Sequence, residues 1–344
     1  MCIVKGTDGM ESMEIVERIG SMDRGDGTGR PVSPVKWKDP RKEFGKAVSE
    51  LAEENEKIVV ISADSGFSSG FKEFAARHPE RYVECGIMEQ GATGIAAGLS
   101  CVGKIPVFCA IAPFVTCRNF EMFRNDLGYM RQNVKIVGRN GGFTYSDLGA
   151  THHSLEDFAI TRMIPGVTVL CPQDPTEIRQ ACKAMLELEG PVYMRIGNPK
   201  IPVLFPEESP FAIGKGRLLR QGNDVALVST GTVTAAALQA AELLEQRGIH
   251  ARVLGMGTVW PLDEELVLRA AAETGGIVTV EEHYVRGGLG SVVAELLSEK
   301  LPVRMKRLGV PLEYAVSGPY EELLRYYGLD AEGIAGAVEK FCGK

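Results

Sequence analysis

The chain has 344 residues, of which 44% are hydrophobic and 24% are charged, a balance typical of soluble globular proteins. Its formal net charge of −7 argues against a surface for nucleic acids or for anionic membranes. No apolar run approaches the roughly 20 residues that span a bilayer, and the start shows no signal-peptide pattern. The eight cysteines form no Cys-x-x-Cys pair, which favours reduced thiols in a cytoplasmic protein.

Residues 1–38 differ from the rest of the chain, because they are rich in glycine and charge and show no hydrophobic period. We expect a flexible N-terminal extension. It contains Gly25-Asp26-Gly27, and Asn55 follows at roughly the spacing of a Gly-Asp-Gly…Asn motif that holds Mg²⁺ in some enzymes. That motif needs a strand before each part, whereas here Gly25 follows a polar loop and Asn55 ends a helical pattern. We therefore predict no metal site on this chain.

Short apolar strands alternate with helices from Asp39 to about residue 200, which predicts a parallel, doubly wound sheet in an α/β domain. Four prolines between residues 198 and 210 then mark a boundary. We assign 39–200 to the first domain and 201–212 to a linker. The expected strands are 57–63, 105–111, 134–139, 167–170 and 192–196, and the expected helices are 41–56, 71–77, 88–102, 115–130, 155–163 and 175–188.

A second alternation of strands and helices predicts a smaller α/β domain over residues 213–344. Its expected strands are 224–230, 251–256, 277–281 and 303–308, and its expected helices are 233–247, 263–273, 290–300, 319–327 and 330–341.

Glu89 stands in the first turn of a helix made of very small residues. Each glycine costs a helix interior up to roughly 1 kcal/mol, so close approach of another backbone or of a flat cofactor would explain them. One interpretation of Glu89 is that it complements the helix dipole. The other is a carboxyl group held in an apolar crevice, where it can share a proton. The small residues are Gly91, Gly94, Ala96, Ala97 and Gly98.

Polar and aromatic residues follow several expected strands at their carboxyl ends, where open parallel sheets bind ligands. Each also has a structural interpretation, as a turn or helix cap, a core aromatic residue or an ordinary ion pair. Adjacent His152 and His153 point in different directions and have no companion ligands, so a metal site there is not expected. The candidates are Asp64 and Ser68 after 57–63, Phe114 and Phe120 after 105–111, Asn140 and His152 after 134–139, and Arg195 in 192–196.

The order of these motifs resembles the C-terminal half of the transketolase family, which consists of a pyrimidine-binding domain and a mixed-sheet C-terminal domain. The resemblance covers almost everything after Asp39 and lacks the half that binds diphosphate and Mg²⁺. The matching motifs are Arg41-Lys42, Ala63-Asp64, Gly86-Ile87-Met88-Glu89-Gln90, Phe114, the segment 149–157 and the segment 190–195, followed by Pro261-Leu262-Asp263-Glu264, Thr279 to His283 and Gly287 to Gly290.

The resemblance implies the separately encoded C-terminal subunit of a split transketolase, which transfers a two-carbon ketol unit between sugar phosphates. Thiamine diphosphate would lie across the interface with an N-terminal subunit that holds Mg²⁺, in an α₂β₂ assembly. The alternatives are a deoxyxylulose-phosphate synthase-like enzyme, the β subunit of a 2-oxo acid dehydrogenase E1 component, and a non-catalytic regulatory module of the same fold.

The same resemblance implies roles for individual residues. Glu89 would share a proton with the aminopyrimidine nitrogen N1′, and His152 would contact the substrate-derived part of the reacting centre. Asp64, Ile87, Met88, Phe114 and Phe120 would contact the cofactor or support it, whereas Arg41, Ser68, Asn140 and Arg195 would bind the substrate with His152. Asn140 replaces a histidine and Ser65 replaces a leucine of the family pattern, which leaves open the substrate's phosphate and the support of the thiazolium ring.

Overall fold

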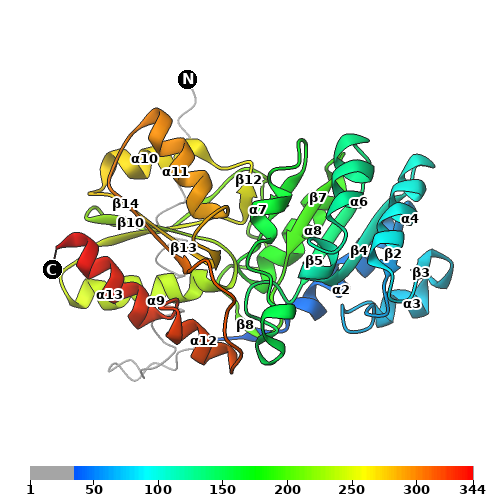
Figure 1. Cartoon of the computed structure of the whole chain (residues 1–344), viewed down its shortest axis with the longest axis horizontal. Helices are drawn as coiled ribbons and strands as arrows, with labels where there is room; N and C mark the ends of the chain where they lie inside the picture. Colours follow the sequence, from blue (N-terminus) through cyan, green and yellow to red (C-terminus); the bar gives the residue numbers. More distant parts are fainter. Residues whose placement is uncertain (1–34, 344) are drawn as a thin grey trace.

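The computed structural model describes residues 35–343, and its two larger β-sheets lie side by side in Figure 1. Gly25-Asp26-Gly27 and most of the expected N-terminal extension lie outside the described residues. The two residues of β1 (Trp37–Lys38) pair with β8 (Ile201–Pro202), so part of the expected extension and part of the expected linker form a small antiparallel sheet. In the described region no helix is long and apolar enough to cross a membrane.

The first sheet has seven strands in the order β12-β6-β7-β5-β4-β2-β3. All neighbours run parallel except β12, which is antiparallel to β6. This confirms the predicted parallel architecture. The strands are β2 (Ile58–Ser62), β3 (Tyr82–Glu84), β4 (Ile105–Ile111), β5 (Lys135–Arg139), β6 (Thr168–Leu170), β7 (Val192–Arg195) and β12 (Thr258–Trp260).

Helices cover both faces of this sheet, because side chains of a strand alternate between its faces. Val107 and Cys109 of β4 pack in one core cluster, and Phe108 and Ala110 pack in another. The first cluster includes α2 (Pro40–Glu54), α3 (Lys72–Arg77) and α8 (Pro175–Glu187), and the second includes α4 (Glu89–Cys101), α5 (Ala112–Val115), the π-helical η2 (Phe123–Tyr129) and α7 (Asp157–Thr161).

The single helix expected over 115–130 is wrong, because the structure breaks it into α5, α6 (Phe120–Met122) and η2. Side-chain hydrogen bonds compete with the helix at the break. The Thr116 hydroxyl donates to the carbonyl of Ala112 (2.7 Å), and the Asn119 amide donates to the hydroxyl of Thr93 (2.6 Å). The second bond fastens the turn to α4.

The second sheet has five strands in the order β14-β13-β10-β11-β9, and only its edge strand β9 is antiparallel to its neighbour. This confirms the expected mixed sheet. Its strands are β9 (Arg217–Arg220), β10 (Val225–Ser229), β11 (Ala251–Gly255), β13 (Ile277–Tyr284) and β14 (Met305–Val310). Helices α9 (Thr234–Gln246), α12 (Tyr320–Tyr326) and α13 (Ala331–Cys342) pack in one core cluster, and α10 (Glu264–Glu273) and α11 (Leu289–Lys300) pack in another.

The two halves of the chain share structure. Strand β12 comes from the second half but pairs with β6 of the first sheet, with Thr258 opposite Leu170. One apolar core cluster also runs from Phe158 in α7 to Leu289 in α11. The sequence patterns predict neither contact, because both depend on residues far apart in the chain.

Candidate active site

Glu89 begins α4, shortly after the carboxyl end of β3, and its side chain is buried although its neighbours in the chain are open. The exposed fraction is 4% for Glu89, but 74% for Ile87 and 46% for Met88. The Glu89 Oε1 atom accepts a hydrogen bond of 2.9 Å from Nη1 of Arg118, in the turn before α6. A buried carboxylate with exposed apolar neighbours fits the second of the two interpretations of Glu89, a carboxyl group held in an apolar crevice.

Phe114 brings an aromatic face to the same place. It lies in α5, directly after the carboxyl end of β4, and its ring faces the guanidinium carbon of Arg118 at 3.8 Å from the ring centroid. Its other contact is the ring of His152, whose centroid lies 5.3 Å away in an edge-to-face arrangement. Phe120 lies farther along and packs against the core cluster that contains Phe123. Glu89, Arg118, Phe114 and His152 therefore form one contiguous group, which we call the Glu89 cluster.

His152 completes the group from the loop after β5. Its Nδ1 atom lies 2.9 Å from the hydroxyl of Thr151, and its ring makes an edge contact with Tyr145 at 5.5 Å. Burial lowers the pKa of His152, and the positive charge of Arg118 lowers it further. The imidazole is therefore neutral at neutral pH and offers one hydrogen-bond donor and one acceptor.

The loop after β2 holds Asp64 and Ser68 at the surface. Asp64 adopts φ = 54°, and its backbone N–H donates to Glu84 Oε1 (2.8 Å), which also accepts from the N–H of Gly86 (2.9 Å). Glu84 thereby fastens this loop to the segment that leads into Glu89. The hydroxyl of Ser68 donates to the carbonyl of Ser65 (2.9 Å) within the loop.

Two arginines lie close enough to repel each other, Arg139 at the carboxyl end of β5 and Arg41 in the first turn of α2. Arg139 closes β5, is 4% exposed and donates from Nη1 to Oδ1 of Asn140 (3.0 Å), while its Nε atom has no partner among the described residues. Burial lowers the pKa of Arg139, and the charge of Arg41 contributes to that shift. Arg41 pairs with Asp39 (2.9 Å). A buried guanidinium with an unused donor suits an anion, whereas the resemblance gave the substrate role at this strand end to the neighbouring Asn140.

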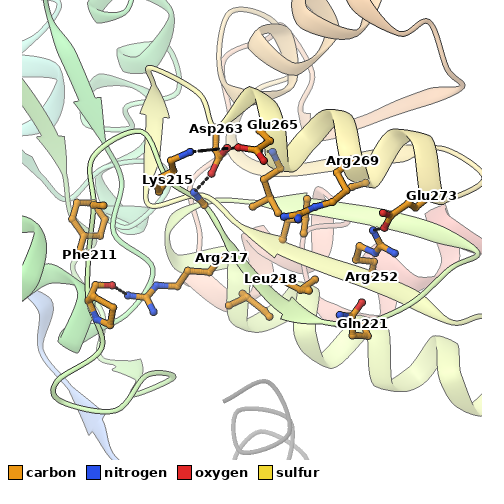
Figure 2. A pocket seen from close by; sticks show the side chains of 17 residues that line it. Phe211, Lys215, Arg217, Leu218, Gln221, Arg252, Asp263, Glu265, Arg269 and Glu273 are labelled. Atoms are coloured by element: carbon orange, nitrogen blue, oxygen red, sulfur yellow. Dashed lines mark hydrogen bonds and ion pairs between the residues drawn. The ribbon is translucent and has the colours of Figure 1, made fainter. Parts of the chain in front are cut away.

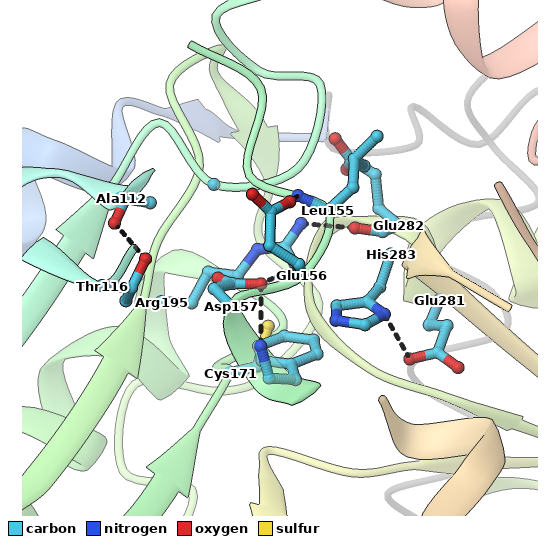
Figure 3. A network of polar contacts seen from close by, with 12 residues as sticks. Ala112, Thr116, Leu155, Glu156, Asp157, Cys171, Arg195, Glu281, Glu282 and His283 are labelled. Atoms are coloured by element: carbon cyan, nitrogen blue, oxygen red, sulfur yellow. Dashed lines mark hydrogen bonds and ion pairs between the residues drawn. The ribbon is translucent and has the colours of Figure 1, made fainter. Parts of the chain in front are cut away.

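Arg195 has a different set of partners, and Figure 3 shows it beside Asp157 and Glu282. It is 5% exposed and donates to Asp157 Oδ1 (3.3 Å) and to the carbonyl of Glu282 in the second half of the chain (2.5 Å). Its guanidinium also lies over the ring of Phe158. Burial opposes the charge, but Asp157 raises the pKa of Arg195. The donors of Arg195 thus face protein groups that join the two halves, which differs from the expected substrate clamp.

Comparisons with known proteins show which family has this combination of domains. The family model described as the transketolase pyrimidine-binding domain matches residues 38–202, and the one described as the transketolase C-terminal domain matches residues 214–334. The chain belongs to the transketolase family. This confirms the predicted resemblance and makes the first half of the chain a pyrimidine-binding domain.

Individual relatives narrow the kind of transketolase. The chain is 41% identical to one subunit of the apulose-4-phosphate transketolase of Phocaeicola vulgatus, over 88% of this chain and 97% of that protein. A solved structure of a split gene transketolase, described as an inactive β4 tetramer, is 43% identical with a TM-score of 0.83 over 89% of this chain and 98% of that one. The 1-deoxy-D-xylulose-5-phosphate synthase 1 of Geobacter sulfurreducens is 39% identical, over 87% of this chain but 47% of that enzyme. This transketolase is of the split, C-terminal-subunit kind and is a transferase component.

A transketolase needs a place for a flat, nitrogen-containing aminopyrimidine ring, and the Glu89 cluster contains a carboxyl group and an aromatic face that could hold one. The guanidinium of Arg118 is itself flat and rich in N–H donors, and it contacts both Phe114 and Glu89. The site therefore fits the pyrimidine end of thiamine diphosphate. Within residues 35–343, no group of three or more acidic, histidine or cysteine side chains could hold a metal ion.

A separate pocket of about 630 Å³ lies in the second half of this transketolase, between β9 and α10 (Figure 2). Two of its arginines are paired with acids, Arg217 with Glu177 (3.4 Å) and Arg252 with Glu273 (2.5 Å). None of its lining residues belongs to the Glu89 cluster. We therefore assign the pocket no part in the candidate active site.

Proposed function

We propose that this chain, together with an N-terminal subunit, transfers a two-carbon ketol unit between sugar phosphates. The observation that carries the proposal is Glu89, a buried carboxylate in the first turn of α4 beside an aromatic face and a neutral imidazole. Such a site serves one end of thiamine diphosphate. The near-complete coverage of the Phocaeicola vulgatus subunit supports a separately encoded partner for the other end.

The residues of the Glu89 cluster would then act on the pyrimidine ring. When bound, thiamine diphosphate supplies a nucleophilic thiazolium carbon that carries the ketol unit. The Glu89 carboxyl group shares a proton with a ring nitrogen, and its burial keeps that proton from exchanging with bulk water. Phe114 stacks on the ring, Phe120 supports it from the core side, and exposed Ile87 and Met88 form the apolar rim.

His152 and the residues near β5 would bind the substrate. A neutral His152 can accept or donate a hydrogen bond to a substrate hydroxyl without adding charge. Arg41 and Arg139 would bind the anionic end, with Asn140 and Ser68 contributing polar contacts and Asp64 bordering the cofactor. In this proposal Arg139, rather than Arg195, binds the anionic end of the substrate, because its Nε donor has no partner within residues 35–343.

The assembly we propose is α₂β₂, with Mg²⁺ and the diphosphate held by the N-terminal subunit. The outer face of α4 supports self-association, since Gly94, Ile95 and Gly98 are exposed and an added side-chain carbon at Gly98 meets no atom within 4 Å. Small residues on an open helix face allow another backbone to approach closely. Cys109 and Cys171 are buried as free thiols, which supports a cytoplasmic, reducing location.

A two-subunit assay tests the proposal. The purified chain, the purified N-terminal subunit and their mixture are each given thiamine diphosphate, Mg²⁺, a ketose phosphate donor and an aldose phosphate acceptor. Only the mixture is expected to transfer the ketol unit. Full transfer by this chain alone would refute the requirement for a partner.

The deoxyxylulose-phosphate synthase reaction stays a second candidate, because the Geobacter sulfurreducens enzyme is 39% identical over 87% of this chain. The same mixture is therefore also given pyruvate in place of the ketose phosphate. Release of CO₂ with condensation onto the aldose phosphate would favour this candidate, whereas inactivity with pyruvate would favour ketol transfer.

A further inference from the structure

Arg118 makes two contacts that a bound pyrimidine ring would also need. Its Nη1 atom donates to Glu89 at 2.9 Å, and its guanidinium carbon lies 3.8 Å from the centroid of Phe114. The guanidinium is planar, positively charged and carries an N–C–N edge, as does a protonated aminopyrimidine. Stacking at 3.8 Å leaves no room for a second flat group on that face of Phe114. The side chain and the ring therefore exclude each other.

The backbone around Arg118 is fixed by hydrogen bonds, but its side chain is partly exposed and can rotate toward solvent. The carbonyl of Arg118 accepts from the Gln90 amide (3.0 Å), and its N–H donates to the carbonyl of Pro113 (3.1 Å). The next residue, Asn119, is held by Thr93 of α4. In contrast, the Arg118 side chain is 43% exposed, whereas that of Glu89 is 5% exposed. A rotation of the side chain toward solvent would clear the site without moving α4 or α5.

We propose that Arg118 is an internal placeholder for the cofactor's pyrimidine ring: it occupies the site in the free subunit and is displaced when thiamine diphosphate binds. The inference rests on the proposed function of the Glu89 cluster. In the free subunit the placeholder compensates the buried charge of Glu89. In the assembled enzyme the ring takes over that partnership, and part of its binding free energy is spent on displacing the guanidinium.

The proposal predicts an unusual mutational effect: removal of the Arg118 side chain should strengthen cofactor binding. The test uses the reconstituted two-subunit complex with Mg²⁺ and measures thiamine diphosphate affinity by calorimetry. Arg118→Met removes the charge and the planar group while keeping an unbranched side chain. We expect its Kd to fall roughly fivefold, the change expected for loss of a competing, partly exposed ion pair.

Arg124→Met is the matched control, because Arg124 lies near Arg118 in the chain, is half exposed and pairs with Glu121 rather than with Glu89. Its Kd should equal that of the wild type. An unchanged or weaker affinity in Arg118→Met would overturn the placeholder. Wild-type complex that binds no thiamine diphosphate would instead overturn the proposed function, so the two failures can be told apart.

A second measurement needs no variant and covers the case in which Arg118→Met does not fold. The wild-type complex is treated with phenylglyoxal, an arginine reagent, with and without thiamine diphosphate, and the modified residues are found by mass spectrometry. Displacement predicts that Arg118 reacts faster in the loaded complex than in the unloaded one, with Arg124 unchanged. Equal or slower reaction of Arg118 in the loaded complex would contradict the displacement.

A third readout follows the charge itself. The charge of Arg118 is one cause of the lowered pKa of His152, after burial. We expect Arg118→Met to raise the pKa of His152, measured by NMR titration of the isolated subunit, whereas Arg124→Met should leave it unchanged. A His152 titration that is the same in Arg118→Met and the wild type would place the guanidinium away from the site and overturn the placeholder.

Discussion

Glu89 and Asp157 are both buried carboxylates that pair with an arginine, but the two pairs are held differently. Arg118 reaches Glu89 with a side chain that is 43% exposed. Arg195 is 6% exposed, and its partner Asp157 also accepts from the hydroxyl of Tyr193 (2.6 Å). The first pair can therefore exchange its cation for another group at little cost to the fold. The second is enclosed and joins β7 and α7 to β13.

Under the proposed function, this contrast separates a residue for chemistry from residues that hold the two halves together, although both kinds look alike in the sequence. When the single partner of a buried carboxylate is solvent-exposed, as Arg118 is, that partner can be replaced by a ligand, so the stability of the ionised carboxylate depends on which group lies beside it. A carboxylate within a closed network contributes to folding, and removal of one member leaves buried charge without compensation. Three substitutions test the distinction.

The largest expected effect is on catalysis by Glu89→Gln. The amide can still accept from Arg118 but cannot share a carboxyl proton with a ring nitrogen, so kcat of the reconstituted enzyme should fall roughly 10²-fold to 10⁴-fold. Steady-state kinetics at saturating cofactor measure this. Thermal unfolding should change little, because the packing around Glu89 is kept. A kcat near that of the wild type would show that the Glu89 carboxylate has no chemical role.

The next effect is on stability, from Arg195→Met. This change leaves Asp157 buried without its cation and should lower the free energy of unfolding by roughly 3–5 kcal/mol. Arg162→Met is the control, because Arg162 also joins the two halves, through Glu295 and the carbonyl of Gly287, but Glu295 is 56% exposed. Its removal leaves no buried charge and should cost only roughly 1–2 kcal/mol. Urea unfolding of the isolated chain compares them. If Arg195→Met instead kept full stability and lost only substrate affinity, the clamp expected from the sequence would be restored.

The smallest effect concerns pH and His283, which is fully buried and stacks on Phe158 at a ring distance of 5.2 Å. Burial lowers the pKa of His283 from 6.5 to about 4. The unfolded chain therefore binds this proton first, and stability is lost as pH falls from 6.5 toward 4, by up to about 3 kcal/mol. In His283→Phe, which keeps an aromatic ring, that loss should disappear.

Glu281 works in the opposite sense within the same network. Burial raises the pKa of Glu281 from 4.5 to about 7, so its contribution to stability is lost as pH rises across that interval. Because Glu281 is present in both proteins, the difference between wild type and His283→Phe isolates the histidine. Urea unfolding at about pH 4.5 and about pH 7 measures it. The same pH dependence in both proteins would show that His283 does not titrate in this range.

The alternation of apolar strands and helices in the sequence predicted most of the fold, and the resemblance to transketolases led to Glu89, Phe114 and His152. Strand β4 and the core of the first sheet follow from local pattern, since Ile105 to Ile111 form a nearly continuous buried run. Glu89 was found because its motif and the small-residue helix are contiguous in the sequence. Local patterns are informative where the structure depends on neighbours in the chain.

The remaining features depend on distant partners. No local pattern shows that β12 joins the first sheet, that Arg195 meets Glu282, or that Arg118 reaches Glu89 across 29 residues. The helix expected over 115–130 failed for a similar reason, because the bond from Asn119 to Thr93 crosses between elements. For Arg118, an arginine shortly after Phe114 is the signal that was available in the sequence.

Because β12 belongs to the second half of the chain but pairs in the first sheet, the two halves cannot be separated simply by cutting the chain between them. A protease that cuts the linker after β8 would break one covalent connection. The fragments would still be joined by the backbone bonds of β12 to β6 and by the apolar core that contains Phe158 and Leu289. Expression of either half alone would expose that shared edge, so the two halves fold best as one inseparable piece.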